Sequence, residues 1–342
     1  MAARLSEMPR AVLRAVRHRI PLRWLERIHL VCNGLVFMFH EVHDDFVRGL
    51  NTGITVSCLN SIIVQLRNEG WDIVALDDVM CRLRDGDPSR RFAVLTFDDG
   101  YRDLLTRALP ILEHHDAPFT VFVPTGAPTR ELHSWWLGVR ALFERRDEVA
   151  IAGMGTVFTC GDIESKMKGC QEVSKWIHQD YRRAPLLTET FREYKISLTS
   201  LNDTQFMNEA ELRVVARHRL ATVGAHTTSH GALSTFDVGL ARLEMSDNRA
   251  YLEHLIDRQV IHLAYPYGTP GACGPREFRL AAEVGFRTAV TARYGPVFSA
   301  HRHHPHAIPR VSAASVSDVC AFPAVISDLR NAVRDPSAAL IQ

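Results

Sequence analysis

The stretch "FAVLTFDDGYRD", residues 92–103, holds the pattern that decides the fold. It starts with an almost continuous apolar run, which is typical of a β-strand buried on both faces when charged residues and a glycine end it. Two carboxylates, Asp98 and Asp99, follow directly. One of them could cap a following helix or belong to a tight turn, but neither role explains why two acidic residues stand together there.

Similar runs recur along the chain, and amphipathic stretches ending near a glycine separate them, as in residues 58–70 and 275–286. Alternating buried strands and helices are typical of an α/β protein with a parallel sheet. We expect the sheet to close into a (β/α) barrel of about seven parallel strands. Besides residues 92–99, the expected strands cover residues 34–40, 119–124, 221–226, 260–268, 287–292 and 307–313.

A single domain over residues 31–325 accounts for this pattern, with a mostly helical insertion at about residues 128–205. Residues 1–30 carry seven arginines and two glutamates, with apolar residues at helical spacing. We expect this basic segment to be a helix packed on the core, although such a helix could also lie on an anionic membrane or act as a transit peptide. Residues 326–342 are expected to form a C-terminal tail.

Composition narrows the class of protein. The net charge of +1 on 342 residues gives no reason to expect a nucleic-acid partner. The seven cysteines are scattered without a CxxC pair, which argues against a disulfide framework or a structural zinc site. Arginines interrupt the N-terminal apolar runs and no stretch is long enough to span a bilayer, so we expect a cytoplasmic protein.

Polar residues with catalytic potential follow several expected strands. His40, the Asp98–Asp99 pair and His226 each end one, and His230 comes four residues after His226. In parallel barrels the active site lies at the carboxyl ends of the strands, so these side chains should meet. Two histidines and one carboxylate leave positions open for water on a metal ion, which is the catalytic arrangement. A histidine pair at this spacing is weak evidence alone, but together with the aspartates it predicts a metal site.

Three motifs, "TFDDGYRD", "GAHTTSH" and "AYPYG", resemble in this order the polysaccharide deacetylase family, the NodB-like carbohydrate deacetylases. The resemblance extends from about residue 36 to residue 310. The stretches "FMFHEV", "WWLGVRALF" and "IPR" are similar to the branch of the family that carries YPYG. The resemblance implies a deformed (β/α) barrel of the NodB type with one divalent metal, most often Zn²⁺. It further implies that Asp99, His226 and His230 hold the metal and that Asp98 is the general base.

The sequence departs from the family pattern at two points. No late "LxxH" motif supplies the general acid. His40 matches relatives in which a histidine of the first strand is the acid. The rival candidates lie in the histidine-rich loop 301–306 and are His303, His304 and His306, although such a loop is more often a solvated surface segment. The arginine that orients the base in many relatives is replaced by Ala264. Arg310 on the last strand could take over this task, and a surface arginine is an equal alternative.

Substrate contacts are expected from residues near these motifs. Tyr101 could donate its backbone N–H to an oxyanion, and Pro266 and Tyr267 could shape a wall of the site. Trp135 or Trp136 could face a sugar ring, but a tryptophan in a helix is more often part of the core.

The constellation together with the family resemblance implies a metal-dependent hydrolase that removes an N-acyl group, with acetyl the expected one, from an amino sugar. The substrate would be a saccharide, a sugar nucleotide or a lipid-linked sugar, and the basic N-terminal segment slightly favours lipid-linked sugar and peripheral contact with the inner membrane face. Hydrolysis of a non-sugar ureide or imide, or deformylation of a formyl-sugar, would suit the same constellation. A carbohydrate-binding protein without activity is the alternative from another class, although no residue of the constellation is missing.

Overall fold

The computed structural model describes residues 32–44, 50, 53–85 and 90–313. The expected basic helix within residues 1–30 and the tail 326–342 therefore lie outside the described residues. No helix in the described part of the chain is long and apolar enough to cross a membrane.

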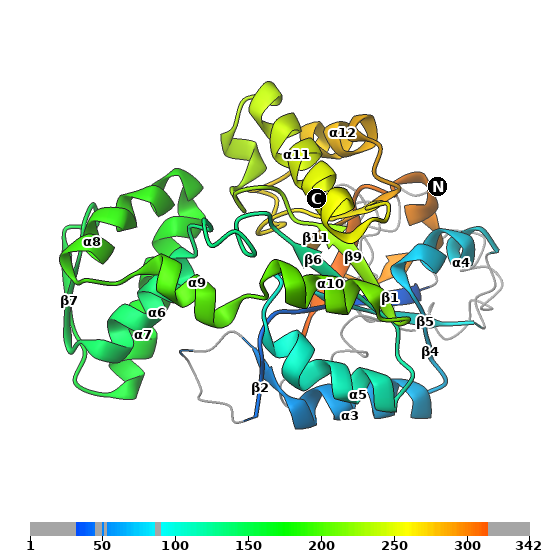
Figure 1. Cartoon of the computed structure of the whole chain (residues 1–342), viewed down its shortest axis with the longest axis horizontal. Coiled ribbons are helices and arrows are strands. Elements are labelled where there is room, and N and C mark those ends of the chain that lie inside the picture. Colours follow the sequence, from blue (N-terminus) through cyan, green and yellow to red (C-terminus); the bar gives the residue numbers. More distant parts are fainter. Residues whose placement is uncertain (1–31, 45–49, 51–52, 86–89, 314–342) are drawn as a thin grey trace, which may run out of the picture.

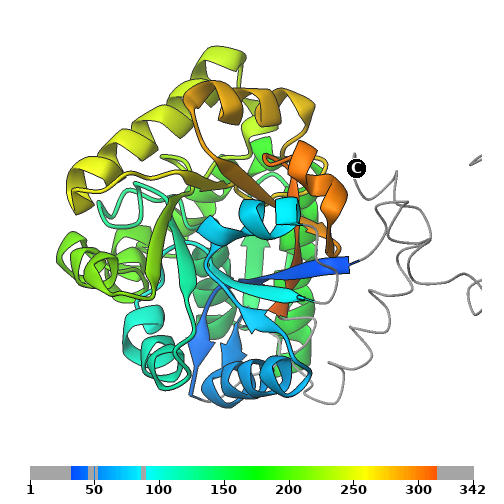
Figure 2. The ribbon, with the colours of Figure 1, turned by 90° about the vertical axis from the view of Figure 1, so that its right-hand side faces the viewer.

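Seven parallel strands form a closed ring. The order around it is β1-β13-β11-β10-β9-β6-β5, and pairing of β5 with β1, as at Phe97 and Phe39, closes it. Figure 2 shows β1, in dark blue, beside β5. The predicted barrel of about seven parallel strands is therefore confirmed. The strands are β1 (Cys32–Phe39), β5 (Phe92–Phe97), β6 (Phe119–Val123), β9 (Ala221–Ala225), β10 (His262–Ala264), β11 (Thr288–Tyr294) and β13 (Ile308–Ser312).

Helices follow the strands, and local signals mark where they begin and end. Thr55 caps α3 by accepting a hydrogen bond from Cys58 N, and α12 begins at a proline and ends at Gly285, where φ is 92°. The helices expected at residues 58–70 and 275–286 are both present. Around the barrel lie α3 (Val56–Asn68), α4 (Val79–Asp85), α5 (Leu109–His114), α10 (Glu209–Arg217), α11 (Val238–Ile256) and α12 (Pro275–Val284).

Short elements complete the barrel. β4 continues the sheet beyond β5, and β12 pairs antiparallel with β1. They are β2 (Val42–His43), β3 (Ile54–Thr55), β4 (Asp72–Ile73), η2 (Leu76–Asp78), η3 (Leu104–Ala108), η5 (Leu233–Thr235), β12 (Val297–Phe298) and η6 (Ser299–His303).

The segment from α6 to α9, which lies between β6 and α10 in the chain, stands beside the barrel and is drawn in green, mostly on the left of Figure 1. It is mostly helical, with its own apolar cluster around Phe143 and Val173. It also contains an antiparallel hairpin that the sequence did not predict, because its four-residue strands are too short to show a period and only Gly153 and Gly155, both at positive φ, mark its turn. The domain bounds stay a prediction. The elements are α6 (Trp135–Arg145), β7 (Glu148–Ile151), β8 (Thr156–Thr159), α7 (Ile163–Gln179), η4 (Tyr181–Leu186), α8 (Leu187–Glu193) and α9 (Leu198–Gln205).

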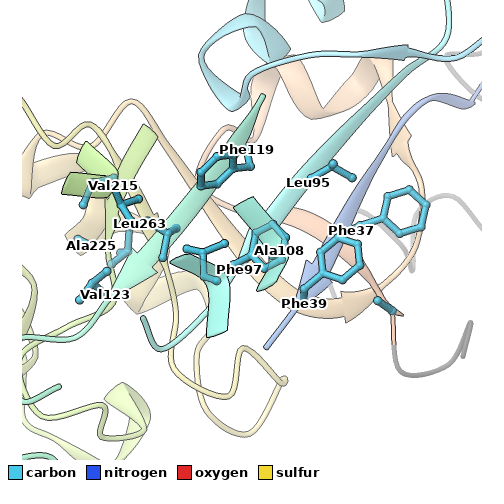
Figure 3. Close-up of a cluster of buried hydrophobic side chains, with 14 of the residues drawn as sticks. Phe37, Phe39, Leu95, Phe97, Ala108, Phe119, Val123, Val215, Ala225 and Leu263 are labelled. Carbon is cyan, nitrogen blue, oxygen red and sulfur yellow. The ribbon is translucent and has the colours of Figure 1, made fainter. Parts of the chain in front are cut away.

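The strands are apolar on both faces because each face packs on a different layer. Phe39 and Phe97 belong to the cluster that includes the surrounding helices, and their rings stack with centroids 4.9 Å apart (Figure 3). Val36, Val94 and Val290 belong to a separate cluster that several strands share. This two-sided burial explains the continuous apolar runs in the sequence.

Candidate active site

The carboxyl ends of β1, β5 and β9 bring the predicted polar residues together. Asp98 and Asp99 follow β5 and are each 3% exposed, while His226 follows β9 and is 1% exposed. His230, 7% exposed, lies beyond it. Asp99 and His230 both have positive φ values, 70° and 58°, which non-glycine residues adopt uncommonly and which often mark functional sites.

Asp99, His226 and His230 direct three ligand atoms at one point, all within 4.8 Å of one another. Asp99 Oδ1 lies 3.4 Å from His226 Nε2 and 3.2 Å from His230 Nε2, yet it has no hydrogen-bond partner among the described residues. His226 Nδ1 lies 2.7 Å from the Ala264 carbonyl oxygen, which can only accept, so this bond leaves Nε2 unprotonated and facing Asp99 in the neutral ring. Two imidazole nitrogens and a carboxylate oxygen that converge in this way fit a divalent cation.

Electrostatics within this set favour the forms that bind metals, with one exception. Burial alone would raise the pKa of Asp99, but His230 and His226 outweigh it and hold that pKa well below its ordinary value. Burial lowers the pKa of His230 despite the nearby carboxylates. Burial also acts to lower the pKa of His226, but Asp99 and Asp98 reverse the shift and raise it. A proton therefore competes with a metal most strongly at His226.

Asp98 faces a buried arginine and not the metal-binding set. Arg310, 1% exposed, donates from Nη1 to Asp98 Oδ1 and from Nη2 to Oδ2, both at 2.7 Å. Arg310 Nε also donates to the Thr291 carbonyl oxygen, so the guanidinium is held from two sides. Burial would raise the pKa of Asp98, but Arg310 and His226 outweigh it and lower that pKa, which keeps Asp98 ionised at neutral pH. Arg310 is thus the buried partner of Asp98, and the surface alternative does not describe it.

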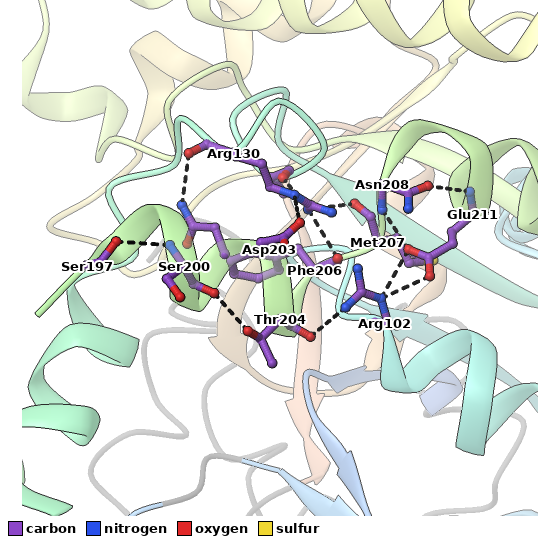
Figure 4. A network of polar contacts seen from close by, with 12 residues as sticks. Arg102, Arg130, Ser197, Ser200, Asp203, Thr204, Phe206, Met207, Asn208 and Glu211 are labelled. Carbon is purple, nitrogen blue, oxygen red and sulfur yellow. Dashed lines mark hydrogen bonds and ion pairs between the residues drawn. The ribbon is translucent and has the colours of Figure 1, made fainter. Parts of the chain in front are cut away.

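The turn after β5 is anchored by the chain that leads into α10. Gly100 has a φ of 73°, and a Cβ there would lie 3.1 Å from Val123, so the turn requires glycine. Tyr101 and Phe206 face each other in an isolated antiparallel β-bridge. The two hydrogen bonds of this bridge come from the neighbouring residues Arg102 and Met207, so the Tyr101 N–H takes no part in the bridge. Arg102 donates to Glu211 and to the Thr204 carbonyl oxygen, as Figure 4 shows.

His40 lies half-buried in the same site. A hydrogen bond from Asp98 N to the Phe39 carbonyl oxygen ties the two strand ends together, and His40 lies near enough to contribute to the lowered pKa of both aspartates. The histidine-rich loop lies elsewhere: it precedes β13, and His306 Nε2 bonds the Phe286 carbonyl oxygen just before β11. That end of the strands is opposite the site, so the loop's histidines are not brought to the aspartates.

The aromatic residues form one wall. Tyr267 packs beside His230 with ring centroids 5.0 Å apart, and Pro266 before it is buried. Trp135 donates to the Tyr267 hydroxyl but is only 3% exposed within the apolar cluster. Trp136 is half-buried and its ring lies 5.0 Å from His230. A ligand at this wall would meet Trp136 before Trp135.

Sequence reasoning missed several residues that support the site. Asn248 accepts a hydrogen bond from His226 N, and Glu244 accepts from the backbone of Thr228 and Ser229. Both lie on the buried face of α11 among apolar residues, and that helical spacing is the signal that could have revealed them. Glu41 and Arg140, which form a buried ion pair, were also missed.

Comparison with known proteins agrees with this geometry. The family described as "Polysaccharide deacetylase" matches residues 85–155 and 178–289, more than half of the chain. The poly-beta-1,6-N-acetyl-D-glucosamine N-deacetylase of Escherichia coli K12 is 33% identical over 97 residues, which are 28% of this chain and only 14% of that relative.

Solved structures show the same fold at low identity. The Streptococcus pyogenes deacetylase PplD, in complex with acetate, has a TM-score of 0.54 at 16% identity and covers 81% of this chain and 91% of its own. IcaB from Ammonifex degensii has a TM-score of 0.51 at 16% identity, with 84% and 97% covered. The chain therefore belongs to the polysaccharide deacetylase family, whose members are hydrolases of carbon–nitrogen bonds other than peptide bonds.

Proposed function

We propose that this protein is a metal-dependent N-deacetylase that acts on an N-acetylated amino sugar within a saccharide. The observation that carries the proposal is the convergence of Asp99, His226 and His230 beside a separate Asp98–Arg310 pair at one end of the barrel. A binding protein would have no need for a second buried carboxylate held ionised next to a metal-binding set.

The three ligands would hold one divalent ion, and we propose Zn²⁺ because imidazole and carboxylate donors suit it. When bound, such an ion polarises an amide carbonyl and makes water more acidic. Asp98 is the base in this proposal: Arg310 uses one lone pair on each of its oxygens, and a carboxylate offers about four such sites, so both oxygens can still accept a proton. In this proposal the Tyr101 N–H donates to the oxyanion that water addition would create, which the absence of that N–H from the bridge to Phe206 supports.

Departure of the amine requires a proton, because an amide anion is too basic to leave. His40 is our proposed general acid, since it is half-buried and close enough to influence both aspartates. Trp136 and Tyr267 would contact the sugar ring. The name of the Escherichia coli relative supports an N-acetylglucosamine polymer as the first substrate to test. The cytoplasmic location and the membrane contact stay predictions that cell fractionation can test.

The decisive experiment combines metal analysis of purified protein with acetate release from N-acetylated oligosaccharides. We expect about one divalent metal per chain, lost in Asp99→Ala and His230→Ala. Asp98→Asn should keep the metal and lose turnover. Metal-free protein that remains active would contradict the mechanism, and hydrolysis of ureides or formyl-sugars alone would contradict the substrate class.

His40→Ala tests the general acid. It should keep the metal and lower amide cleavage by about 10²–10⁴-fold, while cleavage of an activated ester, whose leaving group needs no proton, should fall much less. Equal losses on both substrates would point to another acid. His303→Ala, in the loop at the opposite end of the barrel, is the matched control and should change neither rate.

A further inference from the structure

A buried ion pair joins the segment after β1 to helix α6. Glu41, which directly follows His40, is 0% exposed. Its two carboxylate oxygens accept hydrogen bonds from Arg140 Nη1 and Nη2, both at 2.7 Å, although the residues are 99 positions apart. The Arg140 side chain is only 13% exposed. Two parallel charge-assisted bonds fix the relative orientation of both partners, so the pair sets how α6 meets this segment.

The charges of the pair depend on each other. Burial acts to raise the pKa of Glu41, but His43 and Arg140 outweigh it and lower the pKa to about 2. Burial likewise acts to lower the pKa of Arg140, and Glu41 reverses the shift. Removing one member of the pair would therefore leave the charge of the other buried with less compensation.

Backbone hydrogen bonds hold the residues on either side of His40. The Phe39 carbonyl oxygen accepts from Asp98 N, and the Glu41 carbonyl oxygen accepts from Ile54 N. Val42 N donates to Asp103 Oδ2 at 3.0 Å. These bonds hold the backbone at Phe39, Glu41 and Val42, and α6 holds the Glu41 side chain.

Helix α6 also reaches the turn that carries the aspartates. Trp136, one helical turn before Arg140, donates from Nε1 to the Tyr101 hydroxyl at 2.7 Å. Burial raises the pKa of Tyr101, Glu41 and Asp99 add to the rise, and Arg140 opposes it. Those three charged side chains therefore lie within electrostatic reach of the Tyr101 hydroxyl. One helix therefore contacts both the segment of His40 and the segment of Asp98 and Asp99.

We infer that Arg140 and Glu41 are positioning residues that order the His40 segment and so set how its imidazole faces the aspartates. Neither residue touches the ligand atoms; they act through the backbone next to His40. The catalytic consequence rests on the proposed function, because it requires His40 to be the acid. A small misplacement of a proton donor lowers the rate strongly, so loss of the pair should affect the step that needs the proton.

The test uses the double variant Glu41→Gln/Arg140→Gln, which removes both charges without leaving one unpaired. Arg145→Gln, an exposed arginine on the same helix, is the matched control. We expect unchanged metal content, at least about tenfold slower amide cleavage, and cleavage of an activated ester within about twofold of the wild type. Arg140→Lys, which keeps the charge but donates from one point, should be intermediate.

Hydrogen exchange of the backbone amides at residues 39–43 gives a readout that needs no activity. The double variant should exchange at least about tenfold faster there than the wild type and the Arg145→Gln control. Unchanged exchange, or equal loss of amide and ester cleavage, would overturn the inference. A wild-type protein that releases no acetate would instead overturn the proposed function, and the exchange result would still decide whether the pair orders the His40 segment.

Discussion

Asp103 is a buried carboxyl whose replacement should change stability in a pH-dependent way. It is 7% exposed; Oδ2 accepts from Val42 N, and Oδ1 has no hydrogen-bond partner among the described residues. Burial raises its pKa from the ordinary 3.8 to about 7; the Val42 N–H opposes this rise and the Glu41 carboxylate adds to it. The folded protein thus binds this proton more tightly than the unfolded chain does.

The stability effect follows from the two pKa values. Below about pH 3.8 the Asp103 carboxyl is protonated in both the folded and the unfolded protein, so its ionisation does not lower the free energy of unfolding. As the pH rises, the unfolded chain ionises first, and the free energy of unfolding falls by about 1.4 kcal/mol per pH unit until the pH passes about 7. The total loss is about 4 kcal/mol at pH 8.

Asp103→Asn removes this ionisation, and its amide oxygen can still accept the Val42 N–H. Its buried NH₂ group adds a cost of about 1–3 kcal/mol that does not change with pH. The stability of the variant relative to the wild type should therefore improve by about 4 kcal/mol between about pH 4 and about pH 8.

Urea unfolding of both proteins at several pH values measures this difference. The metal concentration is kept the same throughout, and the contributions of the other titratable groups cancel when the two free energies of unfolding are subtracted. Asp44→Asn is the matched control, because the Asp44 side chain is 70% exposed and its replacement should give a nearly flat difference. A flat difference for Asp103→Asn would refute the reasoning, since it would show that folding does not raise the pKa of Asp103.

Two further predictions concern the site. Arg310→Met should destabilise the protein by about 3–5 kcal/mol in urea unfolding, because it leaves the Asp98 carboxylate buried without its cation. Adding Asp98→Asn should recover much of this loss. A double variant no more stable than the single one would show that Arg310 acts through packing. Zn²⁺ affinity, measured by competition with a chelator, should fall from about pH 8 to about pH 5 because protons compete for His226, whose pKa is raised. An affinity independent of pH would show that the imidazoles do not bind the metal.

Much of the barrel could be predicted because its strands are buried on both faces, which produces continuous apolar runs. The meeting of His40, Asp98 and His226 was also predictable, since the carboxyl ends of parallel strands share one edge. The β7–β8 hairpin could not be predicted, because its strands are short and β8 is mostly exposed. Arg140 resembled an exposed cation on an amphipathic helix. Its burial comes with a tertiary contact to Glu41, which is distant in the chain and is not visible in the local sequence pattern.

The neighbours of β1 in the ring have a consequence for how the chain can be ordered. β1 lies between β13, the last barrel strand in the chain, and β5, the next barrel strand after β1 in the chain. The position that β1 fills is therefore adjacent both to the end of the barrel sequence and to its beginning. Because the ring is closed, a parallel strand in this position could come from either end of the chain. In both cases the residue at its carboxyl end would lie near Asp98 and Asp99. The position of a histidine along the chain is therefore a poor guide to its position in the barrel. A residue far upstream of Asp98 can occupy the place that a downstream motif fills in another chain, and a gene rearranged at this slot would preserve the constellation.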